Sequence, residues 1–204
     1  MLDLIADAGC MQHVILVGSW AEFVYKETGL LAGFSPSIKT LDVDFLIRNL
    51  RRPVPPARLS SLARERGFIV ESDILNGTSR FFDPSGLEVE FLIGKIGAGE
   101  ELSLKTNVGV TAQAIRHLNI LSGNAVEVFY GGHIVQVPNP EAYAVHKMVI
   151  NSQRGRKAEK DARAIIGLWQ YLDRSRLGTV LAGLTKKERL RAEEFMRNHG
   201  LALS

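Results

Sequence analysis

The stretch LDVDFLI (residues 41–47) alternates between apolar and acidic side chains and then becomes wholly apolar. This pattern is typical of a β-strand that runs into a buried core. Because side chains two positions apart on a strand face the same way, Asp42 and Asp44 are expected to stand together. Two neighbouring carboxylates repel each other, and a divalent cation removes that repulsion. Oxygen ligands favour Mg²⁺ or Mn²⁺, although an isolated pair of this kind is more often a solvated strand face.

A second acidic strand strengthens the metal hypothesis. The stretch LEVEFLIG (87–94) places Glu88 and Glu90 on one face, as the first strand does with its aspartates. If the two strands are neighbours, one glutamate completes a site of three carboxylates, which is enough to hold two metal ions. Glu90 precedes the residues FLI, just as Asp44 does. We therefore assign Glu90 to the site and keep Glu88 as the alternative.

A possible anion site precedes both acidic strands. The apolar run HVILV (13–17) predicts a buried strand, and Gly18 and Ser19 follow it directly before a helical pattern over 20–29. Backbone N–H groups at the start of a helix bind anions, and a glycine allows phosphates to approach closely. Capping of the helix by the Ser19 hydroxyl is the competing interpretation. The sequence contains neither GxGxxG nor GxxxxGK[ST], which disfavours dinucleotide-binding and P-loop folds.

The remaining periodicities predict a mixture of helices and strands. Helices are expected at 2–11, 20–29, 57–67, 111–121, from 139 or 140 to 153, and at 157–172, followed by two shorter ones. Strands are expected at 68–72 and 78–83 in addition to those above, with a hairpin at 126–137 around Gly131 and Gly132. In the helix after Ser19, we expect Trp20, Phe23 and Val24 to share the buried face.

These elements predict an α/β (α+β) protein with a mixed sheet flanked by helices. The change of period at Pro138 divides the chain into a core at 1–137 and a helical C-terminal subdomain at 138–204. The single cysteine, Cys10, excludes an intramolecular disulfide and agrees with a reducing cytoplasm. No apolar run approaches the ~20 residues of a membrane span, so neither a membrane partner nor a location outside the cytoplasm is expected.

The order of these motifs resembles the DNA polymerase β-type nucleotidyltransferase superfamily. The matching stretches are VGSWA (17–21), LDVDFLI (41–47) and LEVEFLI (87–93). The later stretch 137–165 is similar to bacterial stand-alone members, including those of the abortive-infection toxin type. The resemblance covers roughly residues 13–170. It departs from the superfamily in the 24 positions between Gly18 and Asp42, where residues 30–39 are expected to form a loop over the site, and in its glutamate as the third acid.

The resemblance implies a set of site residues. It assigns catalysis and Mg²⁺ or Mn²⁺ binding to Asp42, Asp44 and Glu90, and nucleotide binding to Gly18, Ser19, Lys147 and Asp161. Lys147 would neutralise triphosphate charge, and a solvated surface lysine is the alternative. Asp161, with Lys157 or Lys160 beside it, would orient Lys147, Arg154 or Arg156. The sequence leaves open whether Arg80 faces this cleft or solvent.

The implied activity is metal-dependent transfer of a nucleotide from a triphosphate such as ATP to an acceptor hydroxyl, with release of pyrophosphate. The acceptor stays open among RNA, a protein and a small molecule. The basic stretch Arg154–Lys160 mildly favours a polyanion. The alternative is a non-catalytic module of the same fold that binds a nucleotide or a partner, for example as one half of a toxin–antitoxin pair.

Overall fold

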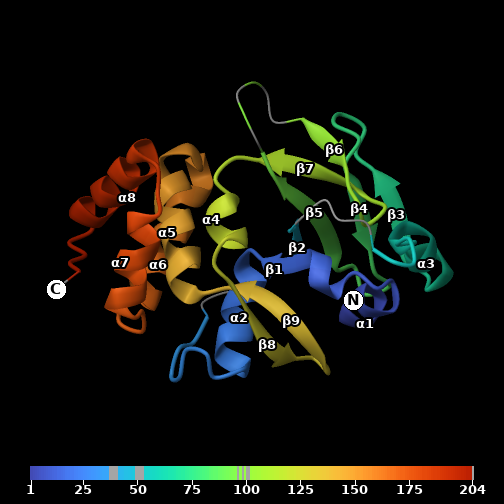
Figure 1. Cartoon of the computed structure of the whole chain (residues 1–204), viewed down its shortest axis with the longest axis horizontal. Coiled ribbons are helices and arrows are strands. Elements are labelled where there is room, and N and C mark those ends of the chain that lie inside the picture. The colour runs from blue at the N-terminus through green and yellow to red at the C-terminus, as the bar shows by residue number, and fades with distance from the viewer. Residues whose placement is uncertain (37–40, 49–52, 96, 98, 100–101, 204) are drawn as a thin grey trace.

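The structure is a computed structural model that describes the chain except for residues 37–40, 49–52, 96, 98, 100–101 and 204. A twisted sheet occupies one side of the molecule, and four helices near the C-terminus form the opposite side (Figure 1). A two-stranded hairpin and helix α2 lie between them at one end. This arrangement confirms the predicted α+β class, with a mixed sheet flanked by helices.

The described residues form a main sheet of seven strands and a separate hairpin. Their bounds are β1 (Val14–Val17), β2 (Asp42–Ile47), β3 (Ile69–Ser72), β4 (Ser79–Phe82), β5 (Glu88–Gly94), β6 (Ser103–Lys105) and β7 (Thr111–Ile115), with β8 (Ala125–Tyr130) and β9 (His133–Pro138) in the hairpin. The main path runs β1-β2-β5-β4-β3, and β7 joins β5 and carries β6 at its far side. Among the strands of the described residues, the parallel pairs are β2–β5 and β5–β7.

The register of β2 against β5 decides where the acids stand. The strands are parallel, with Asp42 opposite Glu88 and Asp44 opposite Glu90. The intervening apolar residues of both strands, Val43 and Val89 among them, enter the main core. On the acidic face, Leu46 belongs instead to a smaller apolar cluster with Ile15, Val17, Leu118 and Leu121. The face that carries the carboxylates is therefore sealed at one end and open at the other.

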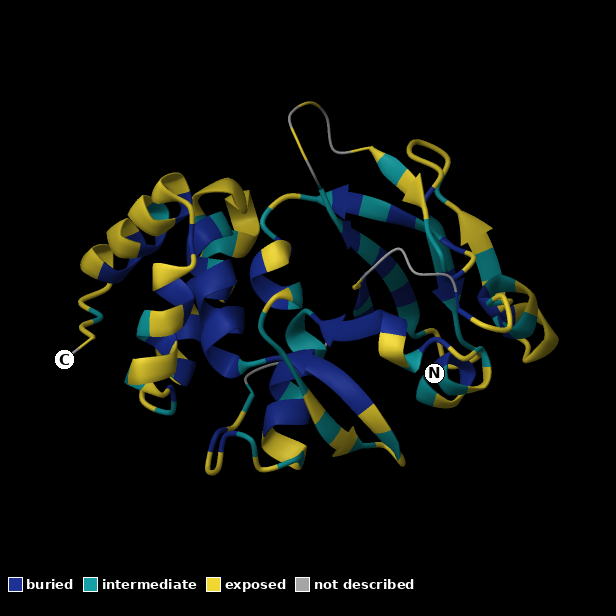
Figure 2. Cartoon of the chain, in the orientation of Figure 1, coloured by how far each residue is buried: buried dark blue, intermediate teal, exposed yellow. Residues whose placement is uncertain are grey.

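Eight helices pack around the sheet in the described chain. They are α1 (Leu2–Asp7), α2 (Ser19–Glu27), α3 (Leu59–Glu65), α4 (Asn119–Ser122), α5 (Pro140–Ile150), α6 (Ala158–Trp169), α7 (Arg174–Ala182) and α8 (Lys186–Asn198). Helix α5 begins where sequence predicts it, because Asn139 caps it by accepting a hydrogen bond from the Ala142 N–H, and Pro140 occupies its first turn. Figure 2 shows α5 as the most deeply buried of the C-terminal helices.

The helix predicted over 111–121 is wrong. Residues 111–115 form β7, and only Asn119–Ser122 are helical. Ala112 and Ala114 are buried while their neighbours are half-buried, which is the two-residue period of a strand. Alanine favours helices when local preference decides, and here pairing with β5 and β6 overrides it. The predicted first helix is also too long, since α1 ends at Asp7 before Gly9, whose φ is +66°.

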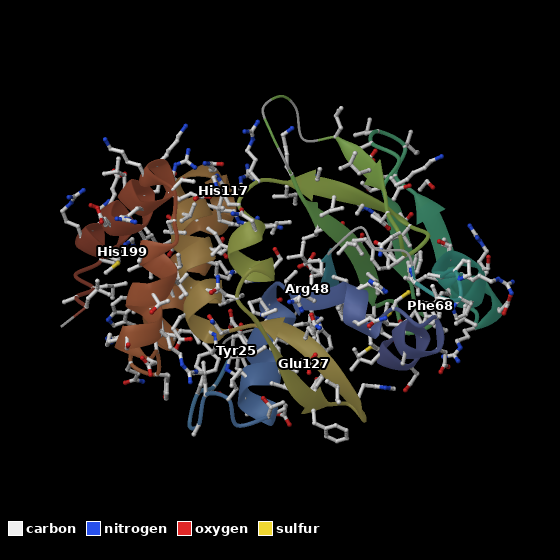
Figure 3. The ribbon with its side chains drawn as sticks, viewed as in Figure 1. Tyr25, Arg48, Phe68, His117, Glu127 and His199 are labelled. Carbon is white, nitrogen blue, oxygen red and sulfur yellow. The ribbon has the colours of Figure 1, made fainter. Side chains whose placement is uncertain are left out.

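The buried face of α2 differs from the prediction. Val24 is fully buried as expected, but Trp20 and Phe23 are half-buried, and Ala21 and Tyr25 take their places in the core. Tyr25 reaches from α2 toward α5, where its hydroxyl donates to the Pro138 carbonyl at 2.8 Å (Figure 3). The tyrosine hydroxyl thereby gives this carbonyl at the end of β9 a buried hydrogen-bond partner.

The main apolar core runs through the sheet and the C-terminal helices, from Leu4 to Met196. A polar contact also joins them, because His117 Nδ1, which precedes α4, lies 2.6 Å from Glu188 Oε1 on α8 (Figure 3). The division of the chain into a core at 1–137 and a helical C-terminal subdomain at 138–204 stays a prediction. Within the described residues, no helix has the length and apolar character needed to cross a membrane.

Candidate active site

A cleft of about 400 Å³ lies between the acidic face of the sheet and helices α5 and α6. All seven residues that sequence reasoning singled out line it: Gly18, Ser19, Asp42, Asp44, Glu90, Lys147 and Asp161. Additional cations at its rim are Arg154, Lys157 and Lys160, and its apolar end is formed by Leu92, Ile115, Leu118, Leu121 and Ile150. The cleft thus has an acidic wall of Asp42, Asp44 and Glu90 on the sheet and a basic wall of Lys147, Arg154, Lys157 and Lys160 on the helical side. Its apolar end is the apolar floor.

Asp44 is the most perturbed group of the acidic wall. Burial, followed by the charges of Glu90 and Asp42, raises its pKa to about 6, while Lys157 and Arg154 act in the opposite direction. Burial also raises the pKa of Glu90, against the opposing effect of Arg80. These shifts mean that the carboxylates lie close enough to destabilise one another's charged forms.

Gly18 fits closely against Asp44. It immediately precedes α2 with φ +66° and ψ −157°, a conformation that residues with a side chain rarely adopt. A Cβ placed on Gly18 would overlap Asp44 Oδ2. The strand end Val17 lies opposite Asp44 in the β1–β2 pair, which brings the turn and the carboxylate together. Glycine is therefore required here by both conformation and space.

Arg80 reaches the acidic wall from β4. Its guanidinium lies 3.2 Å from Glu90 Oε1, 3.1 Å from Glu88 Oε1 and 3.5 Å from Asp73 Oδ2. The question that the sequence left open is thus answered: Arg80 faces the acids. Within the described part of the chain, no three acidic, histidine or cysteine side chains are gathered tightly enough to surround a cation as they stand. Glu90 is instead drawn toward Arg80.

The basic wall is organised around Asp161, which is almost fully buried. Lys147 Nζ donates to Asp161 Oδ1 at 2.5 Å, and Arg154 Nε donates to Oδ2 at 2.8 Å. Burial disfavours the charge of Asp161, but Lys147 and Arg154 outweigh it and hold its pKa below the usual range. Lys147 also lies 5.0 Å from the ring centre of Tyr143. Its side chain is only 13% exposed, so Lys147 is a positioned cation and not a solvated surface lysine.

Sequence reasoning missed three buried polar residues that line the cleft. The Tyr143 hydroxyl donates to Glu22 at 2.5 Å, and burial raises the pKa of Glu22 against that hydrogen bond. Burial, assisted by Lys147, lowers the pKa of His146 to about 3, so its ring is neutral. Glu22 lies on α2 and His146 on α5. No local sequence pattern distinguishes these two buried residues from polar residues at the surface.

The residues of the acidic wall fit a divalent cation by their chemistry. They offer oxygen ligands only, which hard ions such as Mg²⁺ prefer. A cation between them would also relieve the repulsion that raises the pKa of Asp44. Asp42 and Asp44 come from one strand and Glu90 from its neighbour, so the third ligand would have to exchange Arg80 for the metal.

We expect the free energy of unfolding to depend on pH through Asp44 when measured in EDTA. A raised pKa means that the folded chain holds this proton more tightly than the unfolded chain does. The contribution to stability is therefore complete below pH 3.8 and is lost as pH rises through about 6. Such a difference corresponds to at most about 3 kcal/mol, and solvent screening reduces it to about 1–2 kcal/mol.

Urea unfolding at pH 4.5 and pH 7.5 measures this effect. Asp44→Asn has no carboxyl to titrate, so its stability should fall by about 1–2 kcal/mol less than that of the wild type over this interval. The same pH dependence in both proteins would contradict the pKa assigned to Asp44.

Comparison with known proteins gives the class of this fold and site. The chain belongs to a nucleotidyltransferase family, whose model matches residues 1–187. The family is one of transferases, which agrees with the resemblance noted in the sequence. No curated protein sequence matches the chain significantly.

Two solved structures share its fold. One is an antigenic nucleotidyltransferase-like protein from Paracoccidioides brasiliensis, at 15% identity and a TM-score of 0.57, covering 98% of this chain and 88% of that one. The other is ANT(2")-Ia in complex with adenylyl-2"-tobramycin, at 13% identity and a TM-score of 0.51, covering 97% and 96%. At these identities the similarity establishes the fold and leaves the acceptor undefined.

Proposed function

We propose that this protein is a metal-dependent nucleotidyltransferase. It moves a nucleoside monophosphate from a nucleoside triphosphate to an acceptor hydroxyl and releases pyrophosphate. The observation that carries this proposal is the pairing of an acidic wall with a basic wall in one cleft, with the Gly18–Ser19 turn at their junction. A triphosphate needs cations for its oxygens, and transfer of its α-phosphate needs carboxylates for metal ions.

Each part of the cleft has a role in this proposal. Asp42, Asp44 and Glu90 would hold Mg²⁺ or Mn²⁺, which when bound would supply positive charge for the transferred phosphate and for the acceptor oxygen. Gly18 and Ser19 offer backbone N–H groups at the start of α2 to the phosphates. Lys147, fixed by Asp161, neutralises the remaining triphosphate charge. The apolar floor beside α4 accommodates the base.

A second cavity, of about 390 Å³, supplies room for the acceptor. It shares Asp42, Glu90 and Lys157 with the nucleotide cleft and extends past Arg80, Phe82, Gly86 and Glu88. In-line displacement requires the attacking hydroxyl and the leaving pyrophosphate on opposite sides of the phosphorus. Asp42 and Glu90 line both cavities, so a nucleotide in the first cavity and an acceptor in the second would lie on opposite sides of these carboxylates. We therefore assign the acceptor to the second cavity.

Transfer of label from α-³²P nucleoside triphosphates tests the function. The four triphosphates are incubated separately with Mg²⁺ and with RNA, protein and small-molecule fractions of a cell lysate, and products are identified by mass spectrometry. The expected result is an acceptor that gains one nucleotide mass together with release of pyrophosphate. Asp42→Asn serves as the inactive control. A non-catalytic module of the same fold would instead bind nucleotide, in calorimetry, without any labelled product.

We expect Lys147→Ala to weaken triphosphate binding by roughly 10- to 150-fold. A hydrogen bond to a charged group is worth about 1.5–3 kcal/mol, which corresponds to that range. Lys147→Arg should recover only part of the affinity, because a guanidinium is wider than an ammonium and differently hydrated. Calorimetric titration with a non-hydrolysable triphosphate at fixed Mg²⁺ concentration gives the affinities.

Two comparisons keep this result specific. Lys187→Ala removes an exposed lysine on α8 away from the cleft and should leave the affinity unchanged. Binding of Mn²⁺ to the acids should also persist in Lys147→Ala, since Arg154 still pairs with Asp161. Equal triphosphate affinity in wild type and Lys147→Ala would remove Lys147 from the nucleotide site.

A further inference from the structure

Arg80 occupies an unusual position on the open face of the sheet. It lies on β4, opposite Glu90 of β5 on one side and Glu71 of β3 on the other. Side chains at directly opposed positions of antiparallel strands share a face and lie in contact distance. Arg80 therefore faces the acids of β5, and it also lies near Asp73 at the end of β3.

Arg80 forms ion pairs with several carboxylates at once. Its two terminal nitrogens approach Glu88 and Glu90 at 3.1 and 3.2 Å, and its side chain is 37% exposed. Of the three acids assigned to the metal, Glu90 is the one that Arg80 contacts in the described structure. The proximity of Arg80 opposes the rise in the pKa of Glu90 that burial causes. Arg80 therefore already supplies Glu90 with a positive partner.

We propose that Arg80 competes with the catalytic metal for Glu90 and so limits how tightly the site binds a divalent cation. This inference rests on the proposed function, because it takes Asp42, Asp44 and Glu90 as the metal ligands. Arg80 acts through Glu90 and is a positioning residue. It places a positive charge beside Glu90, and a divalent cation on Glu90 would have to displace or oppose that charge.

Electrostatics gives the sign and the size of the effect. From the 3.2 Å ion pair and ordinary metal–oxygen distances, a cation on Glu90 would lie within roughly 6 Å of the guanidinium. A single and a double positive charge at that distance repel each other by an amount equivalent to about tenfold in affinity, even at the dielectric constant of water. A merely structural arginine would have the opposite effect, because its loss would loosen Glu90 and weaken metal binding.

Calorimetric titration with Mn²⁺, without nucleotide, tests the proposal on the full-length chain. Arg80→Gln should bind Mn²⁺ about tenfold more tightly than the wild type. Arg80→Lys retains the charge and should stay closer to the wild-type affinity than Arg80→Gln does. If Arg80→Gln fails to fold by circular dichroism, Arg80→Met, which also lacks the charge, takes its place. Unchanged or weaker Mn²⁺ binding in the uncharged variant would overturn the proposal.

Two further variants separate this inference from the proposed function. Arg58→Gln breaks an exposed arginine–glutamate pair outside the cleft, that of Arg58 with Glu65, and should not alter Mn²⁺ affinity. Asp42→Asn should remove Mn²⁺ binding in both the wild-type and Arg80→Gln backgrounds. If Asp42→Asn has no effect, the metal site and with it the Arg80 inference are wrong. If Asp42→Asn removes binding but Arg80→Gln does not strengthen it, only the role of Arg80 is wrong.

Discussion

Replacing Asp44 by asparagine is expected to lower the rate of nucleotidyl transfer by roughly 10²- to 10³-fold. Asparagine keeps the shape of the side chain beside Gly18 but removes the negative charge that would hold the metal against the transferred phosphate. Loss of one preorganised electrostatic group in an active site costs about 3–4 kcal/mol of activation free energy. The change should not unfold the protein, since it relieves the repulsion that raises the pKa of Asp44.

The measurement is turnover with saturating triphosphate and Mg²⁺, alongside urea unfolding of the same samples. Glu193→Gln is the matched control, because Glu193 is an exposed acid on α8 that lines neither cavity. It should retain nearly full activity. If Asp44→Asn keeps more than about a tenth of the wild-type rate, Asp44 is not a catalytic metal ligand.

Gly18→Ala is expected to be nearly as damaging, for a steric reason. The new methyl group would overlap Asp44 Oδ2, and it would also occupy a backbone conformation that costs about 1–3 kcal/mol for a residue other than glycine. Displacing a catalytic carboxylate by about 1 Å lowers a rate by about 10²-fold. We therefore expect both a loss of stability and a loss of transfer, measured by urea unfolding and by turnover.

Gly29→Ala separates these two effects. Gly29 follows the other end of α2 with φ +70°, and a Cβ there would meet no atom within 4 Å. It should lose stability through backbone strain but keep its rate of transfer. A Gly18→Ala protein as active as Gly29→Ala would show that the close fit to Asp44 has no part in catalysis.

The acidic wall could be predicted because the pattern that places its residues on one face lies within short stretches of the sequence. A two-residue period is enough to place Asp42 and Asp44 on one face, and the repeated FLI after Asp44 and Glu90 anticipated the register in which β2 and β5 pair. The Gly18 turn was recognisable for the same reason, since a strand, a glycine and a helix adjoin in sequence. Family membership, the fold class and the presence of the hairpin followed from patterns of this kind.

Other features depend on pairings that no local pattern encodes. Residues 111–115 form a strand, against the helical preference of their alanines, because they pair with the end of β5 that β4 does not reach. The contact of Arg80 with Glu88 and Glu90 depends on the register in which two strands, β4 and β5, pair, and the sequence analysis left that register open. The predicted loop over the site, residues 30–39, is another case. Residues 30–36 do not line the cleft, and the Tyr171 hydroxyl donates to the Gly33 carbonyl at 3.0 Å. Residues 37–40 lie outside the described residues.

The parallel pairing of β2 with β5 also governs when the site can form as the chain folds. Parallel neighbours cannot be joined by a tight turn, and here α3, β3 and β4 all intervene between them. Bringing Asp44 beside Glu90 therefore requires closure of a loop of more than forty residues, which slows folding compared with a hairpin. On the ribosome, the acidic wall cannot assemble until β5 has emerged, and the basic wall follows only with α5 and α6. The nascent chain thus acquires its complete charge pattern late, when most of the sheet is already in place to hold it.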